Sequence, residues 1–442
     1  MGSAELVDLY LLVKDQFSWG FDIDVGSLTS TSVELYNRNL YGRGHEIRSG
    51  FEYNSSKDQQ WGYIASYKIQ NIRHSHISTG ITFSNNYKRS LIELSLKRRF
   101  ETYMTKYAGG LTLSKTRHSD KINSNDPILN EEPLDFDFAS GWIGRSYKLK
   151  SKKKLAKTQL FSTIGYSYLN FFERPKVKED LNKFFHNKRL YLASLTLNQT
   201  QYFKSNLIYN FGRTEDIPYG YLMQVTAGFE DREFSYRRYL AFEYQRATHF
   251  YKTKAYLFTK FAIGGYFDRD HYEQGNLIIQ NKFISRLRKS GRYRFRNFVE
   301  LNYSLGIRRF PEEFITLNTP TGIRGFKSLE ATGTQRLTLK LEHMTFTPFI
   351  EGGFRFAFFN FVDVGTIGSN QNQPFKNRAY YGAGLGIRLT NENLVFKTIE
   401  LRFAIYPKAP HDFSSPQYGI SGEDRPKFSN FSVDRPKTID FE

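Results

Sequence analysis

Residues 380–389 read Tyr-Tyr-Gly-Ala-Gly-Leu-Gly-Ile-Arg-Leu, and their polarity alternates from one position to the next. The odd-numbered positions carry Tyr, Ala, Leu, Ile and Leu, whereas the even-numbered positions carry Tyr, three glycines and Arg. Residues 398–405 repeat this alternation. Because successive side chains of a β-strand point to opposite faces, each segment predicts a strand with one face suited to lipid and one suited to an interior.

The alternation extends from about Ser18 to the end of the 442-residue chain, in runs separated by Gly, Asn, Asp, Ser or Pro clusters. By this pattern we count about fifteen strands before Pro311 and about five after it, with no convincing helix among them. A soluble β-sandwich also alternates, but two packed sheets seldom use about twenty such strands without a domain break. We therefore predict an all-β protein that forms a transmembrane antiparallel β-barrel over residues 16–442.

Composition is compatible with a barrel and excludes a helical membrane protein. The chain contains 41 Phe and 30 Tyr residues, and such aromatics fit the half-exposed surface of a sheet. No stretch approaches the roughly 18 uninterrupted apolar residues that a membrane-spanning helix needs. A strand that crosses a bilayer needs only about 9 to 11 residues, of which alternate ones face lipid, so an overall polar composition is no objection.

Charge and cysteine content narrow the possible partners. Lys and Arg number 63 and Asp and Glu number 44, which gives a formal net charge of +19. The basic residues are spread along the chain without a recognisable nucleic-acid motif, so we expect no nucleic-acid partner. Phosphate-bearing headgroups of outer-membrane lipid and lipopolysaccharide are the more natural anionic neighbours. Cysteine is absent, so neither disulfides nor thiolate metal sites are available.

A short motif stands in the long loop that follows the strand ending near Arg308. Residues 321–326 read Thr-Gly-Ile-Arg-Gly-Phe; Phe-Val-Asp-Val-Gly follows at 361–365, and then the Gly-rich strand. This order resembles the V/I-R-G-F/Y signature and the last quarter of the BamA/TamA superfamily of outer-membrane protein assembly and translocation factors. Near the start, residues 39–44 read Asn-Leu-Tyr-Gly-Arg-Gly and resemble the N-L/W-x-G-x-G turn of that superfamily.

The resemblance implies a strand number and a place for the loop. It implies sixteen strands, five of them after the signature loop, whereas the alternation allows up to about twenty. It also implies that the loop is folded into the barrel lumen. The signature positions in this sequence are Gly322, Ile323, Arg324, Gly325 and Phe326.

The parity of the strands that follow the loop predicts partners for Arg324. If Leu341 and its alternate neighbours face lipid, Glu342 faces the interior. If Phe358 and its alternate neighbours face lipid, Asp363 also faces the interior. An unpaired charge away from water is strongly disfavoured, and a planar guanidinium suits bidentate pairing with a carboxylate. We expect Arg324 to dock against both acids, which are also the partners that the resemblance implies. The competing interpretation is an external loop with Arg324 in solvent.

The seam where the first and last strands meet is expected to be weak. The first strand contains two glycines without side chains for cross-strand packing, and the final strand, expected within residues 431–441, contains a proline that cannot donate a ladder hydrogen bond. The alternative is that the proline lies outside the paired region and the seam closes fully. The seam residues that we single out are Gly20, Ile23, Gly26, Pro436 and Thr438.

Residues 1–15 carry an apolar run that precedes the first barrel hairpin. The run looks like the final strand of a periplasmic, POTRA-like domain. An outer-membrane protein needs export, and no signal peptide precedes this run, so we expect a longer natural precursor.

Motifs for covalent chemistry are missing from the sequence. It has no G-x-S-x-G elbow, no H-E-x-x-H and no phosphate loop, so we expect no catalytic, cofactor or metal site. The resemblance implies a factor of the bacterial outer membrane that helps to insert or export other proteins through a lateral seam. Its partners would be unfolded or partner outer-membrane proteins, with periplasmic domains or accessory proteins. The alternatives are a passive or ligand-selective channel and the barrel part of a fused lipase.

Overall fold

The computed structural model describes most of the chain. The described residues are 17–27, 30–55, 59–86, 89–121, 131–149, 157–208, 214–269, 271–318, 320–328, 330–369, 377–391, 398–413, 415–422 and 431–441. The predicted periplasmic strand within residues 1–15 lies outside these ranges and stays a prediction.

The described chain is all-β, as the alternation predicts. Its strands are β1 (Trp19–Ser27), β2 (Ser30–Leu40), β3 (His45–Asn54), β4 (Trp61–Ile69), β5 (Ile77–Asn85), β6 (Arg89–Arg98), β7 (Tyr107–Lys121), β8 (Glu131–Leu149), β9 (Thr158–Glu173), β10 (Lys188–Asn206), β11 (Thr214–Arg232), β12 (Tyr236–Phe250), β13 (Ala255–Asp268), β14 (His271–Ile284), β15 (Arg288–Ser290), β16 (Tyr293–Ile307), β17 (Ile315–Thr316), β18 (Thr332–Gly333), β19 (Gln335–Glu351), β20 (Phe354–Gly368), β21 (Arg378–Asn391), β22 (Thr398–Ile405) and β23 (Gln417–Gly422). Two single 3₁₀ turns, η1 (Ile72–His74) and η2 (Lys183–Phe185), lie between strands. Among the described residues no helix is long and apolar enough to cross a membrane.

In the part of the chain that the structure describes, the main sheet has 21 strands. Each strand pairs antiparallel with the next one in the chain, except where β15 and the loop before β19 intervene. β15 is a short continuation of β14, because both pair with β16. The sheet therefore has more strands than the sixteen that the resemblance implied. The count of about twenty strands from the alternation is nearer to the observed number. The additional strands precede the signature loop, where every alternating run is long enough to pair with the next; β19 to β23 follow the loop.

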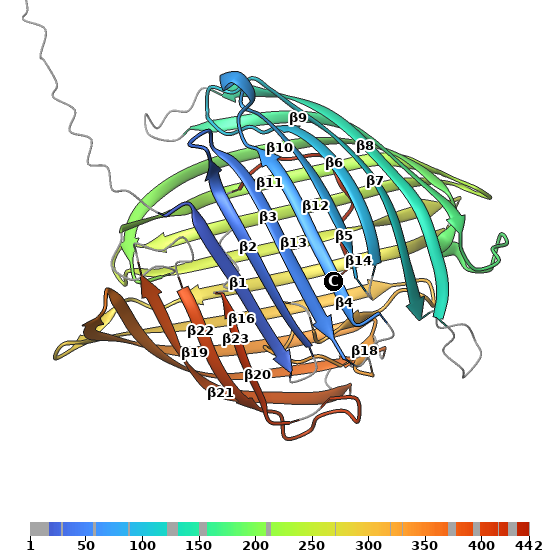
Figure 1. The fold of residues 1–442 in the computed structure, drawn as a ribbon. Coiled ribbons are helices and arrows are strands. Elements are labelled where there is room, and N and C mark those ends of the chain that lie inside the picture. Colours follow the sequence, from blue (N-terminus) through green and yellow to red (C-terminus); the bar gives the residue numbers. More distant parts are fainter. Residues whose placement is uncertain are drawn as a thin grey trace, which may run out of the picture.

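The sheet curls until its first and last strands lie side by side (Figure 1). Cα atoms of β1 and β23 approach within 8 Å of each other. Within the described ranges, however, the ladder of β1 is with β2 and the ladder of β23 is with β22, and none joins β1 to β23. The structure is thus a curled antiparallel sheet whose hydrogen bonding is not closed.

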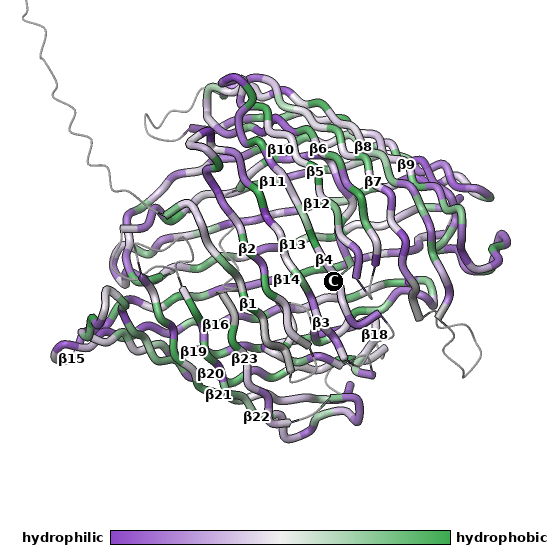
Figure 2. The backbone as a smooth tube through the Cα atoms, viewed as in Figure 1, coloured by the Kyte–Doolittle hydropathy of each residue, from purple (hydrophilic) through white to green (hydrophobic). Residues whose placement is uncertain are grey.

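The two faces of the sheet differ in polarity. On β21, Leu385 is 62% exposed on the outer face, whereas Arg388 is 2% exposed on the inner face. On β20, Val362 is 47% exposed and its neighbour Asp363 is fully buried. Figure 2 shows hydrophobic and hydrophilic positions alternating along the strands. The outer face is therefore apolar and accessible, and the inner face carries polar groups that other parts of the chain cover.

Two segments that are not part of the main sheet cover its inner face. One is the loop between β16 and β19, residues 308–334, which we call the signature loop. Five of its apolar side chains share a buried cluster with the inner side chains of β19 to β22; they are Ile315, Leu317, Ile323, Phe326 and Ala331. The other is residues 431–441, which we call the C-terminal strap. Phe431 and Val433 of the strap are buried in a second cluster with side chains of β9 to β14.

The position of the C-terminal strap corrects the predicted seam. Pro436 and Thr438 do not lie in a strand that pairs with β1: the last strand among the described residues is β23, and Pro436 packs against Gly165 of β9. The physical reason is that the strap gains buried apolar contacts on the inner face, whereas an edge position would leave those side chains exposed. Of the predicted seam residues, Gly20, Ile23 and Gly26 do lie on β1.

Candidate functional site

The signature loop folds back on itself before it reaches the sheet wall. The backbone N–H of Ile323 donates to the carbonyl of Leu317 at 3.0 Å, and the N–H of Phe326 donates to the carbonyl of Ile323 at 3.2 Å. Gly325 has a φ of +72°, a region that glycine enters without steric cost. A Cβ at Gly322 would lie 2.0 Å from the Leu317 carbonyl oxygen. Glycine is therefore required at both signature positions.

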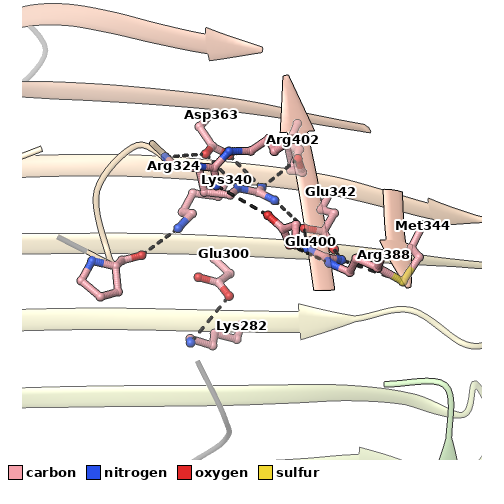
Figure 3. A network of polar contacts seen from close by, with 12 residues as sticks. Lys282, Glu300, Arg324, Lys340, Glu342, Met344, Asp363, Arg388, Glu400 and Arg402 are labelled. Atoms are coloured by element: carbon pink, nitrogen blue, oxygen red, sulfur yellow. Dashed lines mark hydrogen bonds and ion pairs between the residues drawn. The ribbon is translucent and has the colours of Figure 1, made fainter. Parts of the chain in front are cut away.

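Arg324 projects from this turn onto two inward-facing carboxylates (Figure 3). Its Nε and Nη2 donate to Oδ2 and Oδ1 of Asp363 at 3.0 and 2.9 Å, which is a bidentate pair. Its Nη1 forms an ion pair with Oε2 of Glu342. Its backbone N–H also donates to Asp363, at 3.0 Å. The structure thus brings together the arginine and both acids that strand parity indicated, on β19 and β20.

Charge balance keeps the Arg324 guanidinium ionised. Burial lowers the pKa of Arg324, but the carboxylates of Asp363 and Glu342 outweigh that effect and raise the pKa above its ordinary value. The guanidinium also lies over the ring of Phe361, with 4.4 Å between its central carbon and the ring centroid. A cation over an aromatic face adds a further attraction of about 0.5–2 kcal/mol. The loop is therefore anchored by a fixed charge.

The ion-pair network extends to the last strands of the sheet. Arg388 of β21 donates to both oxygens of Glu342, at 2.8 and 3.2 Å, and its Nε donates to Glu400 of β22 at 2.8 Å. Arg402 of β22 lies 3.6 Å from Glu400. Figure 3 shows these groups converging from neighbouring strands. The network alternates cations and carboxylates, so no charge in it is buried without an opposite charge.

Sequence reasoning identified only part of this network. Arg388 and Glu400 both occupy even-numbered, inward positions of the two alternating segments, 380–389 and 398–405. The signal for them was present, because two opposite charges on the same face of neighbouring strands are candidates for pairing. Their pairing depends on register, which sets Arg388 directly opposite Glu400.

The glycine-rich face of β21 receives the loop. A Cβ at Gly382 would lie 2.9 Å from Ile323 and 2.9 Å from the ring of Tyr406. The Tyr406 hydroxyl donates to the Arg324 carbonyl at 2.6 Å, and Phe326 packs edge-on against the Tyr406 ring. Small residues on the wall and large residues on the loop therefore fit together. The sequence pattern indicated only that this face of β21 is turned to an interior, and not that it receives the loop.

No family model matches this chain, and no curated protein matches it. Among solved structures, BamA from Haemophilus ducreyi lacking POTRA domains 1-3 is 14% identical over 92% of this chain and 70% of that chain, with a TM-score of 0.41. CdiB from Acinetobacter baumannii is 9% identical over 92% of this chain and 59% of that chain, with a TM-score of 0.45. OpdL from Pseudomonas aeruginosa is 9% identical over 91% of this chain and 96% of that chain, with a TM-score of 0.38.

The chain is similar in fold to BamA and CdiB. It spans 59% of the CdiB chain, less than two thirds of that protein. Within the described ranges no group of three or more His, Asp or Glu side chains could hold a metal ion. The ion pairs and hydrogen bonds of Arg324 make this an anchoring site, which fixes the signature loop against the wall.

Proposed function

We propose that the chain is the barrel of a BamA/TamA-type factor in the bacterial outer membrane, which helps to insert or export other proteins without covalent chemistry. The observation that carries this proposal is the anchoring of the signature loop by Arg324 on Asp363 and Glu342. The anchored strands, β19 to β22, lead directly to β23 at the open side of the sheet. Outer-membrane lipid and lipopolysaccharide would surround the apolar outer face.

The open side supplies a physical route to assembly. β23 has six residues, Gln417–Gly422, and β1 has nine, so any pairing between them is short. Each missing ladder bond removes about 0.5–1.5 kcal/mol of net stabilisation. An unpaired strand edge is also a template for an incoming strand, which gains main-chain hydrogen bonds by β-augmentation. We propose that β1 and β23 form the lateral seam, with the network stiffening one side of it.

A second candidate function is a passive or ligand-selective channel. The observation that favours it is that the signature loop and the C-terminal strap both lie on the inner face, where they would narrow a pore. Planar-bilayer conductance distinguishes the two, because a channel passes ions or a ligand when client proteins are absent. A fused lipase is a third candidate, whose enzyme would lie outside the sequence described here.

A cysteine lock across the seam tests the proposal. Ile23 and Ile420 are both exposed, and the chain has no cysteine of its own, so Ile23→Cys with Ile420→Cys places one pair of thiols on the two strands; Tyr418→Cys replaces Ile420→Cys if the register of β1 and β23 requires it. Oxidation should abolish complementation of a strain that lacks the protein, and reduction should restore it. The matched control is Ile23→Cys with Val33→Cys, which joins two residues already paired between β1 and β2. A locked seam with full complementation would exclude lateral opening.

A further inference from the structure

The C-terminal strap crosses the inner wall of the sheet without joining any strand. Its Arg435 donates to Ser140 of β8 at 3.4 Å, and its Pro436 packs on Gly165 of β9. Its last described residue, Phe441, packs on Gly306 of β16. Between Arg435 and Phe441 the strap therefore runs from β8 to β16 across the curl, whereas its first residue, Phe431, lies beside β10 and β13.

Side chains of the wall hold the strap by its backbone. The amide of Asn198 donates to the carbonyl of Phe431, and the amide of Asn276 donates to the carbonyl of Asp440. The backbone N–H of Ile439 donates to the Tyr239 hydroxyl at 2.8 Å. These contacts satisfy main-chain groups of an extended segment, so they do not depend on which side chains that segment carries.

Glycines of the wall make room for the strap. A Cβ at Gly165 would lie 2.9 Å from Pro436, and a Cβ at Gly306 would lie 2.6 Å from the ring of Phe441. Both distances are shorter than Cβ contacts in proteins allow. The wall is thus shaped to admit another backbone at close range, which is a recognised use of glycine within a strand.

Aromatic side chains occupy both ends of the strap. Phe431 is fully buried and packs near Phe258, with 6.5 Å between ring centroids. Phe441 lies under the guanidinium of Arg309, 4.2 Å from the ring centroid to the central carbon. The charged residues between them are exposed, and Arg435 also reaches Ser140 of the wall, so the strap buries apolar side chains and leaves its charges accessible. These charged residues are Asp434, Arg435, Lys437 and Asp440.

The contact between strap and wall is incomplete. A cavity of about 290 Å³ lies beneath the strap, lined by Trp142, Lys188 and Glu230 of the wall and by Pro436 and Thr438 of the strap. A tightly packed core leaves few voids larger than a water molecule. The strap therefore does not fill the space beside the wall.

We propose that the inner wall of β8 to β16 is a binding track for an extended polypeptide with aromatic side chains near its two ends, and that the C-terminal strap is its resident, displaceable occupant. The track follows from the contacts above; only the identity of an arriving chain as a protein in transit rests on the proposed function. An intramolecular occupant has an effective concentration of roughly millimolar, so a competitor must reach a similar local concentration to displace it.

A crosslinking competition in the full chain tests this proposal. Gly165→Cys with Pro436→Cys places two thiols at the observed contact. Gly165→Cys with Pro436→Ala and Ser432→Cys is the matched control, in which the same clash is relieved and the second thiol lies four residues away on an exposed position. The probe is a synthetic peptide of residues 431–442, Phe-Ser-Val-Asp-Arg-Pro-Lys-Thr-Ile-Asp-Phe-Glu. At millimolar concentration it should lower the initial rate of disulfide formation several-fold, and a scrambled peptide should not.

The outcomes separate this proposal from the proposed function. Rapid crosslinking that no concentration of peptide slows would show a fixed strap and overturn the proposal. Absence of the crosslink in a folded, heat-modifiable barrel would place the strap elsewhere and overturn it as well. If the first pair prevents folding, Gly264→Cys with Ala241→Gly and Ile439→Cys reports another contact of the strap with the wall, because a Cβ at Gly264 would lie 3.1 Å from Ile439, and Ala241→Gly removes the side chain that this Cβ would otherwise meet at 2.5 Å. If the peptide slows crosslinking of the strap, and the variant with the cysteine lock across the seam still complements fully, the binding track is upheld and the proposed assembly function is rejected.

Discussion

Arg324 donates three hydrogen bonds to the carboxylate of Asp363, one from its backbone N–H and two from its side chain. The two residues are 39 positions apart in the chain. Because main-chain and side-chain donors share one acceptor group, the pairing fixes both the path of the signature loop and the direction of the arginine. Glu342, on the neighbouring strand, forms a second ion pair with the Arg324 guanidinium.

Removal of the Arg324 side chain should destabilise the folded sheet. Arg324→Ala leaves Asp363 and Glu342 near each other without that cation, and breaking a buried pair in this way costs about 3–5 kcal/mol. The free energy of unfolding in detergent, from urea titration, measures the loss. Double variants with Glu342→Ala or Asp363→Ala should lose less than the sum of the single losses. Strictly additive losses would show that the three residues do not share a site, and Arg43→Ala, on an exposed turn, is the control.

A methyl group at Gly382 should push the signature loop away from the wall. Gly382→Ala would place a Cβ 2.9 Å from both Ile323 and Tyr406. Overpacking of a filled core costs about 1–3 kcal/mol. The temperature at which the folded band disappears on a gel should fall accordingly. Gly141→Ala is the matched control, because its Cβ would meet no atom closer than 3.9 Å; equal effects of the two changes would contradict the packing described here.

Loss of the aromatic ends of the strap should widen the interior. Phe431→Ala with Phe441→Ala removes the buried ring at one end and the ring under Arg309 at the other, so the strap should leave the wall more often. Single-channel conductance in a planar bilayer should rise above that of the unchanged chain. Ser432→Ala, at an exposed position of the strap, should leave it unchanged. Identical conductance in both variants would show that the strap does not limit passage.

We expect the purified chain to hydrolyse neither phospholipids nor esters and to bind no metal ion. The reason is the lack of a nucleophile elbow, of a metal-binding motif and of any cysteine in the sequence. Fatty-acid release from phospholipid vesicles and metal analysis of the purified protein measure the two expectations. Turnover that survives repurification would assign an active site to this chain itself.

The alternation of polarity predicted most of the strands and their two faces. Parity alone indicated that Glu342 and Asp363 face inward, and the V/I-R-G-F/Y resemblance pointed to Arg324 as their partner. Such inferences succeed because the period of a strand is local: a residue and its neighbours decide which face each side chain takes.

Only the tertiary structure decided the course of the last residues and the extent of the ion-pair network. The contact between Asn198 and Phe431 joins residues 233 positions apart, and that between Asn276 and Asp440 joins residues 164 apart. A proline such as Pro436 is compatible with an edge strand and with an extended strap alike. The choice depends on which wall offers pockets, glycines and hydrogen-bond donors at the right spacing, and those groups come together only when distant strands have taken their places in the sheet.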